Sequence, residues 1–311
     1  MAIYRIASLW GMRITALLLA ACLLADSGYG ADHTTLHYAS NTSGRTSHAI
    51  EDGFTVMDVT GSPGTPAHTA SLVNALPAGV LALVWVGNLD NAPKGSACPS
   101  PGFTFSQFKA QVDALAGNPK VYGYFLADEP HPSVCPHAAT DIKQRADYIH
   151  AHTTQKAFIV VLDGDNLCPN ALGCEYRALA PNVTHADLIG IDPYPCHYDA
   201  SGKPAPCDAS RIAARVQSAI ANGIPQEAIV PVFQAFGQEG RKDGKKAYYR
   251  TPAPAELQAM LIAWQSAVPA PAMDYSYTFG VQCSASGCPA PQAISNHPEL
   301  AAILRAHNRL Q

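Results

Sequence analysis

Short apolar runs that alternate with helical segments constrain the fold of this chain more than any other feature of its sequence. The runs are rich in β-branched and aromatic residues, as parallel strands buried on both faces are. Eight segments have this character, the first being the weakest: residues 36–39, 54–59, 80–86, 121–127, 157–163, 187–192, 229–236 and 273–279. Between several of them apolar residues recur at helical spacing, for example Phe105, Phe108, Val112 and Leu115.

This alternation predicts an α/β fold, a single-domain (β/α)8 barrel over residues 31–311. Barrels of this kind need about 250 residues as one unit. An open doubly wound sheet fits less well, because no glycine-rich phosphate-binding turn follows the first run. In a barrel, functional side chains lie at the carboxyl ends of the strands. The ends of the eight runs are therefore where a site is expected.

The charge balance limits the partners that the chain can have. Lys and Arg number 20 against 24 Asp and Glu, which gives a net charge of -4. Such a chain has no basic field for a nucleic acid backbone. The cysteines lack the repeated C-x-x-C spacing of a zinc site. We therefore expect no nucleic acid partner, no metal and no cofactor. We also expect a monomer.

The first thirty residues have the pattern of a secretory signal peptide. Arg5 and Arg13 precede the apolar run 14–25, which is too short for a membrane span and is followed by small and polar residues. We expect a secreted or periplasmic protein. An alternative is that Leu19–Cys22 is a bacterial lipobox, in which case Cys22 carries a lipid that anchors the protein at the cell surface.

Eight cysteines remain after Cys22, an even number that favours disulfides in an exported chain. All eight follow predicted strands, so disulfides between them would staple the loops at the face where a barrel site lies. Pairing by proximity gives four bonds: Cys98–Cys135, Cys168–Cys174, Cys196–Cys207 and Cys283–Cys288.

The segment VYGYFLADEP at 121–130 carries the sharpest chemical signal. A buried strand runs directly into Asp128, Glu129 and Pro130, and burial raises a carboxyl pKa toward that of a general acid. The segment resembles the fourth strand of clan A barrel glycoside hydrolases, which ends Asn-Glu-Pro. That resemblance implies that Glu129 is the acid/base residue, with Asp128 in place of the asparagine. An acidic surface turn is the alternative interpretation.

Two further strand ends complete the candidate site. LIGIDPYPC at 188–196 places Asp192 and Tyr194 at the sixth strand. IVPVFQAFGQE at 229–239 places Gln234 where clan A enzymes have their nucleophilic glutamate, and Glu239 is the next acid. The chain thus departs from the clan A pattern at strand seven, which puts the standard retaining mechanism in doubt.

Glycosidases of the usual kind need two carboxyl groups. Asp192 is the favoured partner of Glu129, Asp128 is expected to tune Glu129 as a like-charged neighbour, and three other carboxylates remain candidates: Asp58, Asp163 and Glu239.

Aromatic and amide side chains near the strand ends are candidates for binding the apolar faces and hydroxyls of sugar rings. They are Trp85, Asn88, Tyr194, Gln234, Tyr275 and Tyr277. Trp85 also fits the barrel core. The resulting hypothesis is a glycoside hydrolase that cleaves an oligo- or polysaccharide. A catalytically silent barrel that only binds glycan is the alternative, because strand seven lacks its carboxylate.

Overall fold

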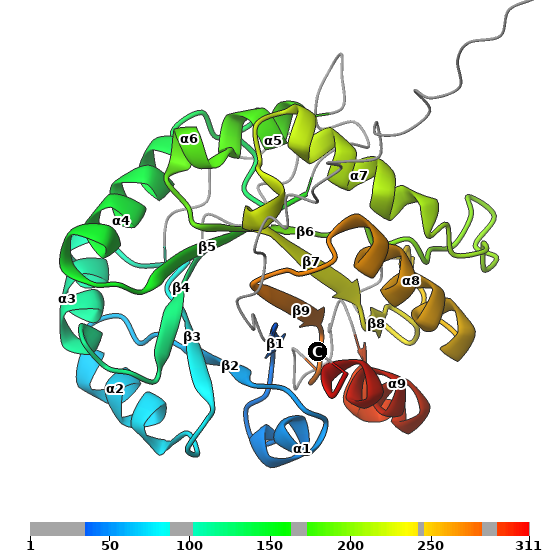
Figure 1. Cartoon of the computed structure of the whole chain (residues 1–311), viewed down its shortest axis with the longest axis horizontal. Helices are drawn as coiled ribbons and strands as arrows, with labels where there is room; N and C mark the ends of the chain where they lie inside the picture. Colours follow the sequence, from blue (N-terminus) through cyan, green and yellow to red (C-terminus); the bar gives the residue numbers. More distant parts are fainter. Residues whose placement is uncertain (1–34, 88–101, 163–172, 242–245, 282–290, 311) are drawn as a thin grey trace, which may run out of the picture. The chain divides into compact units, whose positions relative to one another are not determined.

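Eight parallel strands close into a barrel in the order β1 to β7 followed by β9 (Figure 1). The computed structural model describes residues 35–87, 102–162, 173–241, 246–281 and 291–310. Each strand coincides with one predicted run, so the (β/α)8 barrel is confirmed. The strands are β1 (Leu36–Ala39), β2 (Val56–Thr60), β3 (Leu81–Trp85), β4 (Val121–Asp128), β5 (Lys156–Val161), β6 (Leu188–Ile191), β7 (Ile229–Gln234) and β9 (Met273–Tyr277).

Helices form the outer layer of the barrel (Figure 1). The first crossover holds only a six-residue helix, in keeping with the short distance between the first two runs. None of the helices in the described part of the chain is long and apolar enough to span a bilayer. The helices are α1 (Thr46–Glu51), α2 (Pro66–Ala75), α3 (Phe105–Leu115), α4 (Ala138–His152), α5 (Cys174–Leu179), α6 (Pro181–Thr184), α7 (Ser210–Ala221), α8 (Pro254–Ala267) and α9 (Pro298–Asn308).

The last helix, α9, is tied to the first βα unit. Arg305 Nε donates to Asp52 Oδ1 at 2.8 Å, and Asn308 Nδ2 donates to the Asp52 carbonyl at 3.0 Å. Two short strands, β8 (Phe236–Gly237) and β10 (Gln292–Ala293), form a separate antiparallel ribbon beyond the ends of β7 and β9.

Alternate side chains on each strand enter two different cores. On β2, Val56 packs inside the barrel and Met57 packs under the helices, as the two-residue period of a strand requires. The interior is tight where β6 passes between its neighbours. A Cβ added to Gly190 would lie 2.8 Å from a methyl of Val160 and 3.1 Å from one of Val232. Glycine at this position therefore allows the strands to close.

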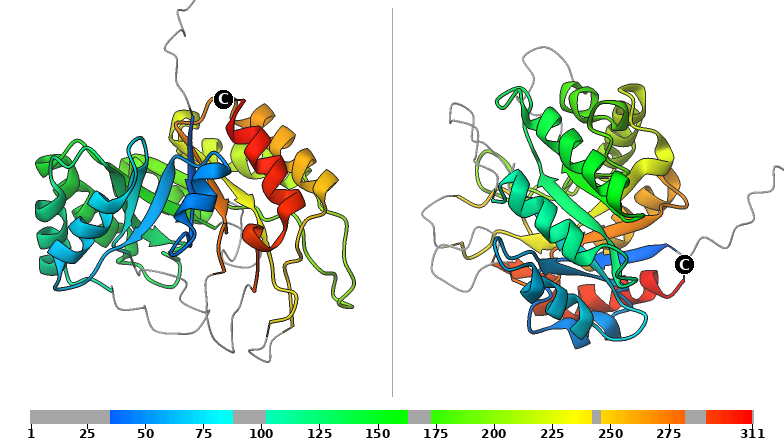
Figure 2. Two further views of the ribbon diagram at one scale, coloured as in Figure 1. Left: turned by 90° about the horizontal axis from the view of Figure 1, so that it is seen from below. Right: turned by 90° about the vertical axis from the view of Figure 1, so that its left-hand side faces the viewer.

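The loops that follow β6 and β7 extend from one side of the barrel, and α9 ends on the other (Figure 2). The predicted bond Cys196–Cys207 is present and closes the loop between β6 and α7. Cys135 and Cys174 each take part in a further disulfide bond. The other predicted disulfide cysteines, Cys98, Cys168, Cys283 and Cys288, lie outside the described residues, as do Cys22 and the expected leader. The three pairings that involve these four cysteines stay predictions.

Removing the Cys196–Cys207 bond by a double serine substitution is expected to lower the free energy of unfolding by about 3 kcal/mol, because a short cross-linked loop restricts the unfolded chain. Urea denaturation under non-reducing conditions measures this. The single variant Cys207→Ser should lose a similar amount, since it breaks the same bond. A double variant as stable as the unmodified chain would show that the loop is held by its other contacts alone.

Candidate active site

Strand β4 brings two carboxylates to the mouth of the barrel. Asp128 ends the strand opposite Val160 of β5, and the Glu129 backbone N–H donates to the Val160 carbonyl at 3.0 Å. Glu129 has a φ of +48°, in the left-handed region that non-glycine residues rarely adopt. The following Pro130 is buried and has no N–H to extend the ladder. This abrupt turn ends the strand between two adjacent acids, as the Asp-Glu-Pro motif predicts.

Asp192 follows β6 and is the buried partner of Glu129. Its side chain belongs to a residue that is 1% exposed. Burial raises the pKa of Asp192 well above its usual value, and the neighbouring Glu129 carboxyl and the charge of Asp128 raise it further. Neither carboxylate oxygen of Asp192 has a hydrogen-bond partner among the described residues. This environment favours the protonated form of Asp192 beside Glu129.

The two carboxyls interact as neighbouring acids at the barrel mouth. Two like charges close together disfavour ionisation of both, and here the buried Asp192 is the group whose pKa rises. The structure thus brings Glu129 together with Asp192, the partner that the sequence favoured, and places Asp128 beside them.

Aromatic rings enclose the acid pair. Tyr194 lies 5.0 Å from Phe236 and 5.4 Å from Tyr249 between ring centroids, and Phe236 lies 5.0 Å from Tyr277. Burial, with the charges of Asp192 and Glu129, raises the pKa of the Tyr194 phenol. The phenols consequently stay protonated and can donate hydrogen bonds. This wall excludes water from one side of the dyad.

Backbone strain gathers at the same mouth. Four non-glycine residues of the described chain have positive φ, and three of them belong to this region: Asn41 at +58°, Glu129 at +48° and Tyr194 at +34°. Strain of this kind persists where surrounding contacts enforce it, most often at functional sites. Here it lies next to both members of the acid pair.

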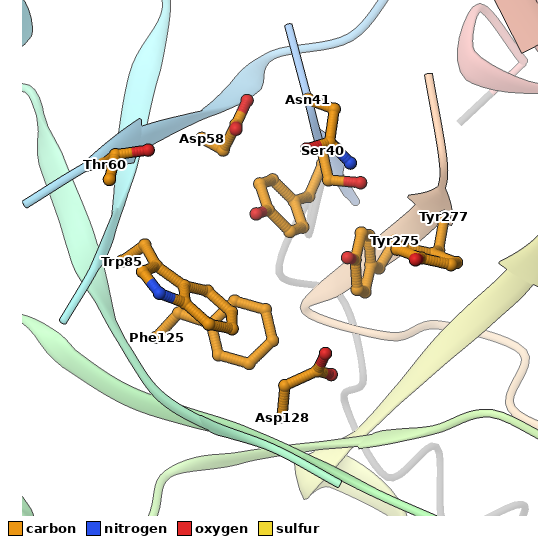
Figure 3. Close-up of a pocket in the computed structure, with 10 residues that line it drawn as sticks. Ser40, Asn41, Asp58, Thr60, Trp85, Phe125, Asp128, Tyr275 and Tyr277 are labelled. Carbon is orange, nitrogen blue, oxygen red and sulfur yellow. The ribbon is translucent and has the colours of Figure 1, made fainter. Parts of the chain in front are cut away.

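A pocket of about 310 Å³ opens beside the acid pair, at the small end of the range of about 300–1,000 Å³ for ligand sites. Figure 3 shows Asp58 and Asp128 on opposite sides of it, with Trp85 and Phe125 along one wall and Tyr275 and Tyr277 along another. The Trp85 and Phe125 rings meet edge to face with centroids 4.4 Å apart. Its described lining is Tyr38, Ser40, Asn41, Asp58, Thr60, Trp85, Phe125, Asp128, Tyr275 and Tyr277.

Several lining residues escaped the sequence analysis. Ser40, Asn41 and Thr60 are single polar residues at the ends of β1 and β2, where no motif marks them. Tyr38 and Phe125 sit inside apolar runs and look like core. Tyr38 pairs with Val56, two residues before Asp58, so its inward direction follows from the strand period once the register is known. Phe125 lies three residues before Asp128 and faces inward because the register of β4 shifts between Phe125 and Ala127.

Gln234, at the end of β7, lies outside the pocket lining and is fully buried. Its side chain Oε1 accepts from the Cys196 N–H at 2.8 Å, and its Nε2 donates to the carbonyls of Cys196 at 2.8 Å and Arg250 at 3.0 Å. The amide therefore joins the loop after β6 to the loop after β7. The amide is thus a structural connector, and its contact with substrate stays a prediction.

Replacing Gln234 with leucine is expected to destabilise the protein by about 3 kcal/mol or more, because it leaves buried backbone groups without partners at roughly 1–3 kcal/mol each. Thermal unfolding measures the loss. Gln226→Leu, on the exposed turn before β7, serves as the matched control and should change stability little. A Gln234 variant that unfolds like the control would show that water replaces the lost amide.

Glu239 is also engaged away from the acid pair. Its Oε1 accepts from the Thr251 N–H at 2.6 Å, and its Oε2 accepts from the Thr251 hydroxyl at 2.9 Å. Two predicted site residues, Asn88 and Asp163, lie outside the described residues. Of the candidates for a second carboxylate, the structure thus brings Asp192 to Glu129, places Asp58 across the pocket and fixes Glu239 to Thr251.

Clusters of metal-ligand type within the described ranges lie away from the pocket. One consists of Cys196, Cys207 and Glu256, but the cysteines are bonded to each other. In the other, Asp274 Oδ2 lies 2.9 Å from His37 Nδ1 and 3.1 Å from His307 Nε2.

Burial raises the pKa of Asp274, but hydrogen bonds from the two histidines outweigh it and bring the pKa below its usual value. The second cluster therefore works as a buried charge network between β1, β9 and α9.

Comparison with known proteins shows the fold. No family model and no curated protein matches this sequence. Among solved structures, the Bacillus cereus spore cortex-lytic enzyme SleL is 11% identical with a TM-score of 0.54, and 88% of this chain and 74% of that chain are covered.

A plant class V chitinase mutant from Cycas revoluta, in complex with (GlcNAc)3, is 12% identical with a TM-score of 0.53, and 88% and 100% are covered. A β-galactosidase from Bacillus circulans sp. alkalophilus is 8% identical with a TM-score of 0.61, and 89% and 56% are covered. At these identities the likeness establishes the shared (β/α)8 barrel fold.

Proposed function

We propose that this protein hydrolyses O-glycosidic bonds of an oligo- or polysaccharide, with Glu129 as the general acid and base. The observation that carries the proposal is the position of two acids at the barrel mouth, Glu129 after β4 and the buried Asp192 after β6, which interact so that the pKa of Asp192 rises. Paired titratable groups in unlike environments are a signature of acid/base catalysis. The solved structures with this fold that are named above include enzymes that act on glycans.

The environments of the two carboxyls divide their tasks. Asp192 is sealed from solvent, whereas Glu129 is half-buried and lies beside Tyr277, which lines the pocket. Glu129 therefore gives a proton to the glycosidic oxygen as the bond from that oxygen to the anomeric carbon breaks, and the buried Asp192 is the neighbouring acid that passes its own proton on to Glu129. In the second step Glu129 takes a proton from the water that attacks the anomeric carbon.

Positive charge that develops on the sugar ring needs a nearby negative group. Because Gln234 is a connector, strand β7 does not provide one. Asp128 faces the pocket one residue before Glu129, and in this proposal its carboxylate stabilises that charge. Trp85 and Tyr277 supply the apolar surfaces against which sugar rings pack.

Export is part of the same proposal. The Cys196–Cys207 bond supports it, because disulfides persist mainly in oxidising compartments. The carbohydrate substrate is then one that the protein meets outside the cytoplasm.

A glycan panel tests the proposed function. The protein is incubated with neutral, amino and acidic oligosaccharides, and new reducing ends are measured. Turnover that is lost in Glu129→Gln and kept in Glu227→Gln, an exposed residue on the turn before β7, supports hydrolysis by Glu129. Binding without turnover by the unmodified protein would favour the non-catalytic glycan-binding barrel, for which the missing β7 carboxylate is the specific argument.

A further inference from the structure

The charge of the pocket carries information about its ligand. Asp58 and Asp128 face it from opposite sides (Figure 3). No Lys or Arg stands among the lining residues that the structure describes. Glu129 and Asp192 add further acidic groups next to it. A ligand that enters this pocket therefore meets carboxylates from two sides, partly shielded from water by aromatic walls.

Asp58 presents one oxygen that no described residue occupies. Its Oδ1 accepts from the Thr42 N–H at 2.9 Å and from the Thr42 hydroxyl at 2.7 Å. These bonds fix the carboxylate on β2. No described donor reaches Oδ2, so this oxygen can accept a hydrogen bond from a ligand.

The Tyr38 hydroxyl is a second polar group that can bind a ligand. Its side chain lines the pocket and belongs to a residue that is 1% exposed, and its hydroxyl has no described hydrogen-bond partner. Burial raises the pKa of this phenol well above its usual value, and the charges of Asp58 and Asp128 raise it further. The Tyr38 hydroxyl is therefore a neutral donor held between two acids.

The walls and the size of the pocket also bear on its ligand. The half-buried Trp85 and the buried Tyr275 give the pocket apolar walls, against which the apolar face of a sugar ring packs. The volume of about 310 Å³ suits a small polar group on such a ring better than a long aliphatic chain.

Resting on the proposed function, we infer that this pocket binds a sugar that carries a protonated amine, such as a 2-amino-2-deoxy sugar unit, and rejects uronic acids. The ammonium lies between Asp58 and Asp128 and donates a hydrogen bond to Asp58 Oδ2. A uronate brings a third carboxylate into the same space, and like charges there are repelled.

Binding to the full chain carrying Glu129→Gln tests the inference without hydrolysis of the probes. Isothermal titration in mildly acidic buffer compares three oligosaccharides of equal length: deacetylated chitin oligomer, its N-acetylated form and oligogalacturonate. We expect the deacetylated oligomer to bind about tenfold or more tighter than the acetylated form, and the galacturonate to show no measurable binding.

Pocket variants assign the preference to its cause. Asp58→Asn, in the same Glu129→Gln background, retains an oxygen for the Thr42 bonds and should reduce the preference for the deacetylated oligomer about tenfold. Tyr38→Phe, which removes only a hydroxyl, should weaken both chitin-derived oligomers by a smaller factor. Asp113→Asn, exposed on α3, is the matched control and should change nothing.

The inference is overturned if galacturonate binds as tightly as the deacetylated oligomer, if none of the three probes binds, or if Asp58→Asn leaves the preference intact. Its failure can be told apart from failure of the proposed function. Selective binding of the amino oligomer without any turnover by the unmodified protein would remove the hydrolase and keep the pocket assignment. Turnover of a uronate polymer would do the reverse.

Discussion

Glu129→Gln is expected to lower the rate of glycan hydrolysis about 10²–10⁴-fold, the usual contribution of a positioned general acid and base. Glutamine has the shape of glutamate but has no proton to give to the leaving oxygen. It retains hydrogen-bonding groups for Asp192, so the fold should be preserved. Initial rates on the best substrate of the panel measure the effect, and circular dichroism checks the structure.

The leaving group provides the sharpest control on this assignment. Aryl glycosides with acidic phenols need little protonation, so their cleavage by Glu129→Gln should be far less impaired than cleavage of natural linkages. Glu227→Gln should behave like the unmodified protein on both. An equal loss on both substrate types would contradict the role of Glu129 as proton donor to the leaving group and point instead to binding.

Asp192→Asn is expected to reduce hydrolysis about a hundredfold and at the same time to raise the free energy of unfolding at neutral pH by about 1–3 kcal/mol. Activity falls because asparagine cannot share a proton with Glu129. Stability rises because the substitution removes the cost of a buried carboxyl that contacts another acid.

The pH dependence has a definite sign. The pKa of Asp192 is raised in the folded state, so the unfolded chain releases this proton first as the pH increases. The contribution of Asp192 to stability is fully present below the usual carboxyl pKa and is lost as the pH rises toward the folded value. Asp192→Asn should flatten this decline.

Urea denaturation across the acidic to neutral range, with Asp113→Asn as control, measures the stability effect. If Asp192→Asn is less stable than the unmodified protein at neutral pH, the raised pKa of Asp192 is contradicted. A variant that is more stable and equally active would remove Asp192 from the mechanism.

The barrel could be predicted from the sequence because strands buried on both faces leave continuous apolar runs, and each of the eight runs became a strand. The Glu129–Asp192 contact was also expected, since both residues end strands that point to one mouth. Several helices were not anticipated. The four-residue α6 and the six-residue α1 are too short for a helical period to be detected.

The parts of the site that could not be predicted depend on tertiary contacts. Gln234 occupies a position where a functional residue is expected. Only the fold shows that its amide forms hydrogen bonds with the backbone of Cys196 and Arg250. Ser40 and Asn41 follow β1 and Thr60 ends β2, and closure of the barrel brings these strand ends around the pocket. No local pattern encodes that orientation.

Through the Gln234 amide, the loops after β6 and β7 form one structural unit. If either loop alone is replaced by a loop from another barrel, the buried Gln234 amide or the backbone groups that it bonds lose their partners. A chimera should therefore fold only when both loops and Gln234 are exchanged together. The segment after β1 is tied to β2 in a similar way, because the Thr42 N–H and hydroxyl both donate to Asp58, so this segment too would have to be exchanged together with its partner strand.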